Sequence, residues 1–189
     1  HYIESVLKPT SLANVSLLPA TTSLATLERQ VSGQDGMGLV VARTLAQLWD
    51  DYDYALIDTP PILGVLLVNA LAACQRLVVP TQTEHLAMKG LERMVHTLKM
   101  VMRSQNRQLP YLIVPTLFDR RTSASVTTLK EMRRTYVESL WDEAIPVDTR
   151  LRDASHEGVF PHQMDPDTRG VRAYRHLLNI LDMSEDAHA

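Results

Sequence analysis

The sequence feature that most constrains the fold is the apolar run Tyr-Ala-Leu-Ile at 54–57, which is followed by Asp58, Thr59 and two prolines. An apolar run without polar alternation predicts a strand buried on both faces, as in a parallel sheet. The prolines have no N–H to donate, so they end the ladder. Asp58 is therefore predicted at the carboxyl end of a buried strand, where open α/β sheets bind ligands. An aspartate that caps the following turn is the alternative interpretation of this stretch.

Three more apolar runs predict strands, and helical periodicity fills the intervals between them. The alternation predicts an α/β fold, in which a mostly parallel sheet is flanked by helices on both faces. Prolines near the ends of three runs are expected to confine pairing to the first residues of each strand. No linker or repeat interrupts the pattern, so residues 1–189 are predicted to form a single domain. The predicted elements are strands over 15–20, 54–59, 76–82 and 111–117, and helices over 38–49, 86–102, 124–138 and 170–182.

Composition narrows the class of partner. A net charge of -3 over 189 residues demands neither nucleic acid nor an anionic membrane, so either contact would need a local patch. Such a patch is predicted between Arg103 and Arg134, where seven basic and two acidic residues give a net charge of +5. A solvated helix face is the alternative interpretation. The single cysteine, Cys74, cannot form an internal disulfide. It is predicted to be a small core residue, and the use of one cysteine favours a protein of the reducing cytoplasm. No signal peptide or membrane-spanning run is found.

An aspartate at a strand end is also one half of a nucleoside-triphosphate site. It can hold Mg²⁺, because this ion prefers carboxylates and keeps part of its water shell. The other half, a glycine-rich loop with a lysine at a helix start, is absent, since no Lys-Ser or Lys-Thr follows Gly33, Gly36 or Gly38. The seven histidines form no metal-binding pair at helical spacing, and no serine stands in a Gly-x-Ser-x-Gly setting.

Four stretches in order resemble the ParA/MinD-type ATPases, and the resemblance as a whole spans residues 12–182. "YDYALIDTPPILGVLLVNAL" is similar to the Walker B and switch II region of that family, and "VVPTQTEHLAMKGLERM" to the strand and helix that follow. "VPTLFDRRTSAS" resembles the strand and loop that reach the nucleotide base, and "IPVDTRLRDASHEGVFPHQMDPDTRGVRAY" the C-terminal segment. The phrases "LATLERQ", "TLFDRRT" and "IPVDTRLRDAS" are most similar to ParA-like proteins encoded beside bacterial chemotaxis genes, which direct chemotaxis arrays to the cell pole.

The resemblance implies an ATPase that uses ATP and Mg²⁺, forms a homodimer in the ATP state, and positions cargo such as chemotaxis arrays or partitioned DNA. It implies that Asp58 is catalytic and binds the metal, with Thr59 beside it at the nucleotide. Thr116, Pro146 and Asp148 are the expected rim around adenine and ribose, with ordinary loop residues as the alternative.

The expected partners are nonspecific DNA and a protein cargo or polar landmark. No membrane is expected, because the acidic tail lacks the amphipathic targeting helix of MinD. The basic window and the resemblance together give the expected DNA-binding residues: Arg120, Arg121, Lys130, Arg133, Arg134, Arg150 and Arg152.

The sequence also departs from the family. The P-loop strand, its two lysines and the switch I aspartate would precede everything seen here, and the chain begins with His1 instead of Met. We therefore expect the C-terminal portion of a ParA-like ATPase domain, which alone is marginally stable and does not hydrolyse ATP. Asp148 stands where many relatives carry Arg or Asn, and Ser155 replaces a usual proline. The alternatives are a P-loop-free interaction module that binds a protein without hydrolysis, and a regulatory ATPase for a flagellar or secretion partner.

Overall fold

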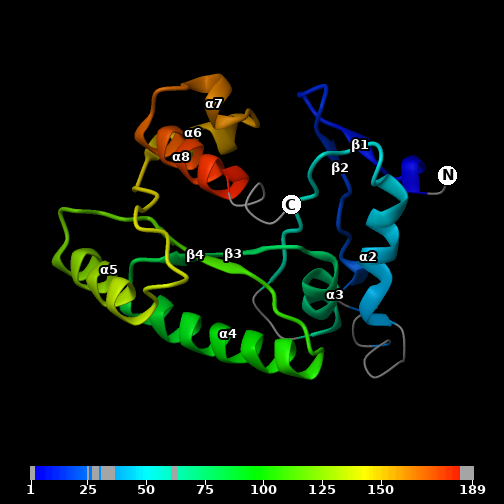
Figure 1. Cartoon of the computed structure of the whole chain (residues 1–189). Helices are drawn as coiled ribbons and strands as arrows, with labels where there is room; N and C mark the ends of the chain where they lie inside the picture. Colours follow the sequence, from blue (N-terminus) through cyan, green and yellow to red (C-terminus); the bar gives the residue numbers. More distant parts are fainter. Residues whose placement is uncertain (1–2, 25, 27–29, 31–36, 61–63, 184–189) are drawn as a thin grey trace. The chain divides into compact units, whose positions relative to one another are not determined.

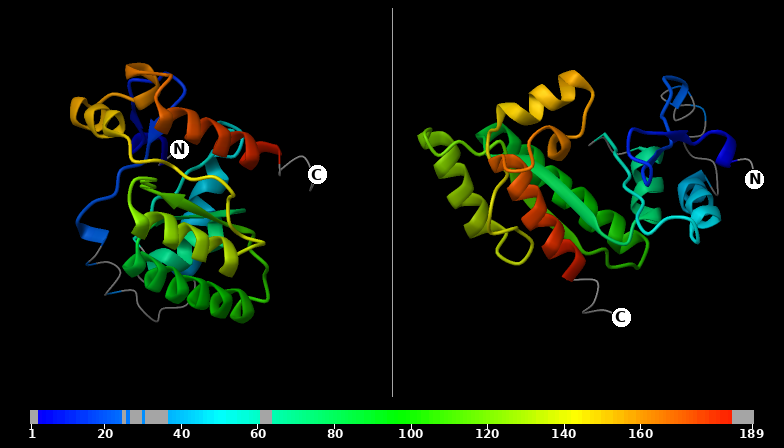
Figure 2. Two further views of the ribbon diagram at one scale, coloured as in Figure 1. Left: turned by 90° about the vertical axis from the view of Figure 1, so that its left-hand side faces the viewer. Right: turned by 90° about the horizontal axis from the view of Figure 1, so that it is seen from above.

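The computed structural model describes residues 3–24, 26, 30, 37–60 and 64–183. They belong to two compact units, and Figures 1 and 2 show the chain from three directions. The first unit comprises His1–Gln75 and Lys99–Gln108, and the second unit comprises Arg76–Leu98 and Leu109–Ala189. Within the described ranges, no helix is both long and apolar enough to cross a membrane.

The second unit is built on two parallel strands, β3 (Leu77–Gln82) and β4 (Tyr111–Thr116). The register runs from Leu77 opposite Tyr111 to Gln82 opposite Thr116. Helix α4 (His85–Ser104) connects them, as a parallel pair requires. Along the other edge of β4 lies the segment 139–147, which forms parallel bridges at Leu140 and Pro146. The predicted strands over 76–82 and 111–117 are confirmed.

Helices cover both faces of this sheet because successive strand residues point to opposite sides. Ile113 is fully buried among Leu91 and Val95 of α4 and Met132 of α5 (Ser123–Thr135). Val114 packs on the other face, in a cluster with Leu177 of α8 (Arg169–Met183). Figure 1 shows α4 and α8 on opposite sides of β3 and β4. The predicted α/β fold with helices on both faces is confirmed.

Pro80 and Pro115 do not shorten β3 and β4, so for these two strands that part of the prediction was wrong. The carbonyl of Pro115 accepts the Ile145 N–H at 2.8 Å, so the backbone of Pro115 faces the segment 139–147. The carbonyl of Thr116 accepts the Thr83 N–H at 3.1 Å, so Thr116 and the residues that alternate with it face β3. By the same alternation Pro80 faces away from β4. Both missing N–H groups therefore lie outside the ladder between β3 and β4.

Two short helices that the sequence analysis did not predict connect the segment 139–147 to α8. They are α6 (Thr149–Glu157) and α7 (Pro161–Met164). Helix α6 ends at Gly158, whose φ of 68° is left-handed, and the following Val159 N–H bonds the Ala154 carbonyl at 3.0 Å. At the far end of α8, the Arg76 guanidinium donates to the Leu181 carbonyl at 2.6 Å. Cations at helix C-termini are stabilising because the last carbonyls lack partners.

In the first unit, a short antiparallel pair precedes a helical layer. Helix α2 (Val40–Leu45) packs on α3 (Val65–Ala73), where buried Asn69 accepts the Val41 N–H at 3.2 Å and donates to the Val65 carbonyl at 2.8 Å. The helix predicted over 38–49 is confirmed, and the strand predicted over 15–20 shrinks to two residues in an antiparallel pair. The elements are η1 (Ile3–Ser5), β1 (Lys8–Pro9), β2 (Ser16–Leu17), η2 (Met37–Leu39), α2 (Val40–Leu45), η3 (Ala46–Leu48) and α3 (Val65–Ala73).

The strand predicted over 54–59 is absent from the described structure, and this prediction was wrong. Leu56 is 99% exposed and Tyr54 is 62% exposed. A strand exists only where a neighbouring strand pairs with its N–H and C=O groups. None of the described strands pairs with 54–60. An apolar pattern therefore does not suffice to make a strand there.

Arg107 holds the end of α3. Asn106 is left-handed, with φ at 48°, and closes α4 in a Schellman turn in which the Arg107 N–H donates to the Met102 carbonyl at 3.0 Å. The Arg107 guanidinium donates to three carbonyls at the end of α3, those of Leu71 (2.9 Å), Ala72 (3.2 Å) and Cys74 (2.5 Å). Burial raises the pKa of the Cys74 thiol, against the lowering effect of the Arg107 charge.

Candidate functional site

Asp58 and Thr59 lie in the first unit, in the extended stretch before α3. The Asp58 side chain is exposed and Thr59 is half-buried. Across the described ranges, no three His, Cys, Asp or Glu side chains gather as a metal site would require. Magnesium seldom needs such a cage, because one or two carboxylates, water and substrate phosphates complete its shell. The donors at Asp58 and Thr59 therefore suit Mg²⁺ carried with a nucleotide, and they do not suit a metal held by protein alone.

The three predicted rim residues come together at the carboxyl edge of β4, in the second unit. Thr116 is the last residue of β4, and Phe118 just beyond it forms the bridge to Pro146. The Phe118 N–H donates to Ile145 at 3.0 Å, and its carbonyl accepts the Val147 N–H at 3.0 Å. Asp148 follows directly. Strand ends of this kind are where α/β sheets present ligand-binding loops.

The Asp148 carboxylate connects the starts of two helices. One oxygen accepts the Arg150 N–H at 3.0 Å, which makes Asp148 the N-cap of α6, and the other accepts the Gly170 N–H at 2.8 Å in the first turn of α8. Burial raises the pKa of Asp148, but these amides, the Thr168 hydroxyl and the Arg169 charge outweigh it and hold the pKa below its ordinary value. Because helix α6 was not predicted from the sequence, this capping role of Asp148 was missed; an Asp just before the stretch 149–157 is the signal that could have revealed it.

A chain of hydroxyl groups, buried at Thr83 and Ser125, fixes the loop between β4 and α5, and sequence reasoning missed it. Thr83, just after β3, pairs through its hydroxyl with the Ser125 hydroxyl at 2.5 Å. The Ser125 oxygen also accepts the Asp119 N–H at 3.1 Å. Thr122, the N-cap of α5, accepts the Ser125 N–H at 3.4 Å. The ends of β3 and β4 are thereby tied to the start of α5.

The loop before α5 also carries a bidentate ion pair. The Arg121 guanidinium donates to the two Asp119 oxygens at 2.9 and 2.8 Å, and its backbone N–H donates to the same carboxylate at 2.9 Å. The hydrogen bond from the Arg121 side chain is the main reason that the pKa of Asp119 falls to about 2. Arg121 is 81% exposed, so its remaining N–H groups face solvent.

The remaining predicted DNA-binding residues are exposed in the second unit, on α5, on α6 and in the loop before α5. Lys130, Arg133 and Arg134 project from the solvent side of α5, whose opposite side buries Leu129 and Met132. Arg133 donates to the backbone carbonyl of Asp142. In the part of the chain that the structure describes, no ion pair joins the others to an acidic group. The basic residues without such an ion pair are Arg120, Lys130, Arg134, Arg150 and Arg152.

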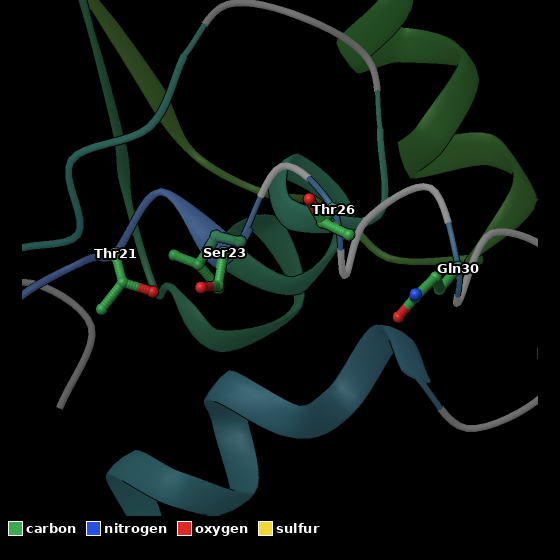
Figure 3. A pocket seen from close by; sticks show the side chains of 5 residues that line it. Thr21, Ser23, Thr26 and Gln30 are labelled. Atoms are coloured by element: carbon green, nitrogen blue, oxygen red, sulfur yellow. The ribbon is translucent and has the colours of Figure 1, made fainter.

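One hollow of about 400 Å³ lies in the first unit, and Figure 3 shows it from close by. It is lined by Thr21, Ser23, Leu24, Thr26 and Gln30, of which four carry hydroxyl or amide groups. These described lining residues include no charged side chain. The hollow therefore offers hydrogen bonds to a ligand but no group that would neutralise a phosphate.

Comparison with known proteins adds relatives of known class. Residues 1–111 match the profile of a family described as AAA domain. Sporulation initiation inhibitor protein Soj of Bacillus subtilis is 31% identical over 185 residues, which cover 97% of this chain and 71% of Soj. Chromosome-partitioning ATPase Soj of Treponema pallidum is 30% identical over 177 residues, which cover 93% of this chain and 70% of that protein.

Solved structures agree with this fold. Cobyrinic acid a,c-diamide synthase from Mycobacterium smegmatis, with bound ATP analog and magnesium, is similar at a TM-score of 0.78 and 28% identity, over 99% of this chain and 69% of that one. A plasmid partition protein from Borrelia burgdorferi, at a TM-score of 0.70 and 21% identity over 96% and 67% of the two chains, is similar in fold. With the family profile and the two Soj relatives, the chain belongs to the AAA domain family, among the ParA/MinD-type ATPases.

Proposed function

We propose that the chain is the C-terminal portion of an ATP-dependent positioning ATPase, which dimerises with ATP bound and binds DNA without sequence preference. The observation that carries the proposal is the rim at the carboxyl edge of β4, where Thr116 and Asp148 lie on either side of the Phe118–Pro146 bridge. In a ParA/MinD-type ATPase, this edge is suited to hold the adenine and ribose of a nucleotide. Pro146 would supply an apolar contact to the base.

Asp58 would hold Mg²⁺ through water, with Thr59 beside it, and the bound ion would neutralise phosphate charge. The 189 residues contain no glycine-lysine phosphate loop, so we assign hydrolysis to the natural full-length protein. The test is ATP turnover by that protein with Asp58→Ala, and Asp53→Ala serves as the control because Asp53 is an exposed carboxylate of the same segment. We expect turnover to be lost only in Asp58→Ala. Turnover that survives this change would refute the metal assignment and favour an interaction module without hydrolysis.

DNA binding would use the exposed basic residues of α5, the preceding loop and α6. Sequence-independent binding requires only Lys and Arg placed against phosphates. Arg133 already donates to a backbone carbonyl, so the sharper test removes Lys130 and Arg134, as Lys130→Gln with Arg134→Gln. With ATP bound, this double variant should weaken binding to every sequence alike and lower the salt slope by about one unit per lost contact. If the double variant and the wild type have equal DNA affinity and equal salt slope, Lys130 and Arg134 belong to a solvated helix face that does not contact DNA.

The cargo would be a protein complex such as a chemotaxis array or a polar landmark, as the phrases "TLFDRRT" and "IPVDTRLRDAS" suggest by resemblance. Dimerisation would be ATP-dependent. Sedimentation of the natural protein with ATP and with ADP tests this, and we expect the dimer only with ATP. A dimer of equal strength with both nucleotides would contradict the proposed cycle.

A further inference from the structure

The segment that carries Pro146, residues 145–148, is fixed at both of its ends. At the sheet, the Val147 N–H donates to the Phe118 carbonyl at 3.0 Å. At the other end stands Asp148, whose carboxylate bonds backbone amides in the first turns of α6 and α8. The direction in which the chain leaves the sheet after Pro146 therefore depends on this carboxylate.

The Asp148 carboxylate is already supplied with donors by the protein. Its Oδ1 accepts the Arg150 N–H at 3.0 Å, and its Oδ2 accepts the Gly170 N–H at 2.8 Å. The Thr168 hydroxyl is a third donor. Hydrogen bonds to both oxygens hold the carboxylate in one orientation and leave it less capacity to accept a hydroxyl group of a ligand. Its main partners are therefore the two helices that it connects.

The close approach of α8 to Asp148 depends on the absence of a side chain at Gly170. Gly170 is buried, and a Cβ atom at this position would lie 2.8 Å from Leu151 Cδ1 and 3.1 Å from Asp148 Oδ2. Carbon atoms pack at about 3.5–4.0 Å, so an alanine would push on the Leu151 side chain of α6 and crowd the carboxylate. Figure 1 shows α6 beside α8, with which it is in contact. Glycine thus allows the amide of α8 to reach the carboxylate.

We propose that Asp148 and Gly170 are positioning residues for the nucleotide, which hold the Pro146 segment at the base, and that the Asp148 side chain does not contact the ribose. The inference rests on the proposed function, because it concerns the same rim at the carboxyl edge of β4. In this arrangement Gly170 acts on the nucleotide only through Asp148. Loosening the contact between the two residues should therefore weaken nucleotide binding and leave the chemical step unchanged.

The experiment measures the affinity of the natural full-length protein for a fluorescent, non-hydrolysable ATP analogue, and KM and kcat for ATP. Gly170→Ala crowds the contact, although alanine is otherwise the better helix residue, and Leu151→Ala added to it removes the crowding side chain. The matched control is Gly90→Ala in α4, where a Cβ atom meets nothing within 4 Å. Asp148→Asn replaces one acceptor oxygen by an NH₂ group, so one of the two amides loses its partner. Thermal melts verify that each variant folds.

We expect Gly170→Ala and Asp148→Asn each to bind the analogue about tenfold more weakly, because a smaller fraction of the protein is arranged for binding. KM should rise by the same factor, with kcat within about twofold of wild type. Leu151→Ala should restore most of the affinity of Gly170→Ala, and the Gly90→Ala control should bind as wild type does. In Asp148→Asn, KM for 2′-deoxy-ATP and 3′-deoxy-ATP should rise by the same factor as KM for ATP.

Wild-type affinity in either variant would overturn the inference, and so would a loss in Gly170→Ala that Leu151→Ala does not relieve. A loss in Asp148→Asn that disappears with a deoxy analogue would make Asp148 a direct ribose ligand and would also overturn it. If Gly170→Ala does not fold, Asp148→Asn alone decides. All these outcomes leave the proposed function standing, whereas a wild-type protein that binds no ATP would overturn both.

Discussion

Replacing Asp148 by alanine should destabilise the chain because two helix starts lose the same acceptor. The change removes the N-cap of α6 and leaves the Gly170 N–H of α8 without its 2.8 Å partner. Loss of an N-cap costs typically about 1 kcal/mol, and loss of a hydrogen bond to a charged group costs at least as much. We therefore expect the free energy of unfolding to fall by about 2 kcal/mol. For a chain of this size the midpoint would fall by roughly 4–8 °C.

The assay is thermal unfolding followed by circular dichroism, with Asp148→Asn as the matched variant. Asparagine caps helices about as well as aspartate, so we expect it to retain most of the stability. Because the pKa of Asp148 is lowered in the folded chain, its contribution is complete above the ordinary value of 3.8 and is lost as the pH falls through the folded pKa. The gap between wild type and Asp148→Ala should therefore narrow below pH 3.8. An alanine variant that melts within 1 °C of wild type at neutral pH, on the order of the assay's resolution, would refute the double-cap reasoning.

Three further predictions follow from contacts in both units. Arg107→Met should lower the unfolding free energy by about 1–3 kcal/mol, measured by urea titration, because three carbonyls at the end of α3 lose their donor. Ser125→Ala should lower the unfolding free energy by about 1–3 kcal/mol in the same assay, because the Thr83 hydroxyl and the Asp119 N–H both lose their partner. Ser125→Thr keeps a hydroxyl and tests whether any hydroxyl suffices. In an NMR titration the Asp119 carboxyl should titrate at a pKa of about 2, and Arg121→Gln should move it toward 3.8. An unmoved pKa would show that the ion pair does not set it.

The structure shows which sequence signals were reliable. The sequence predicted helices α4, α5 and α8 because each carries an apolar stripe that packs on the sheet. It predicted strands β3 and β4 because each is an apolar run that forms the sheet. The strand over 54–59 could not, because an apolar pattern specifies burial but says nothing of the partner strand that must pair with it. The prolines misled for a related reason. Their missing N–H matters only on the side that faces a neighbouring strand, and this side depends on register.

At the candidate site, the sequence placed Thr116, Pro146 and Asp148 on one edge, and the structure brings them together around the Phe118–Pro146 bridge. The sequence could not predict that the Asp148 carboxylate accepts the Gly170 N–H, because that contact joins residues 22 apart and depends on how α6 and α7 turn the chain. The hydroxyl pair of Thr83 and Ser125 was equally hidden, since single hydroxyl residues carry no period. Local pattern reveals elements, whereas contacts between distant side chains require the fold.

The contact between Asp148 and Gly170 also determines how the end of the chain opens. It closes a stretch of 22 residues that holds α6 and α7, and α8 is held at its other end by the bond from Arg76 to Leu181. Opening α6 alone would leave the carboxylate with half its amide partners, so α6 and the start of α8 are expected to unfold together as one unit. In native-state hydrogen exchange, the amides of Arg150 and Gly170 should then share a single opening free energy, smaller than that of β4.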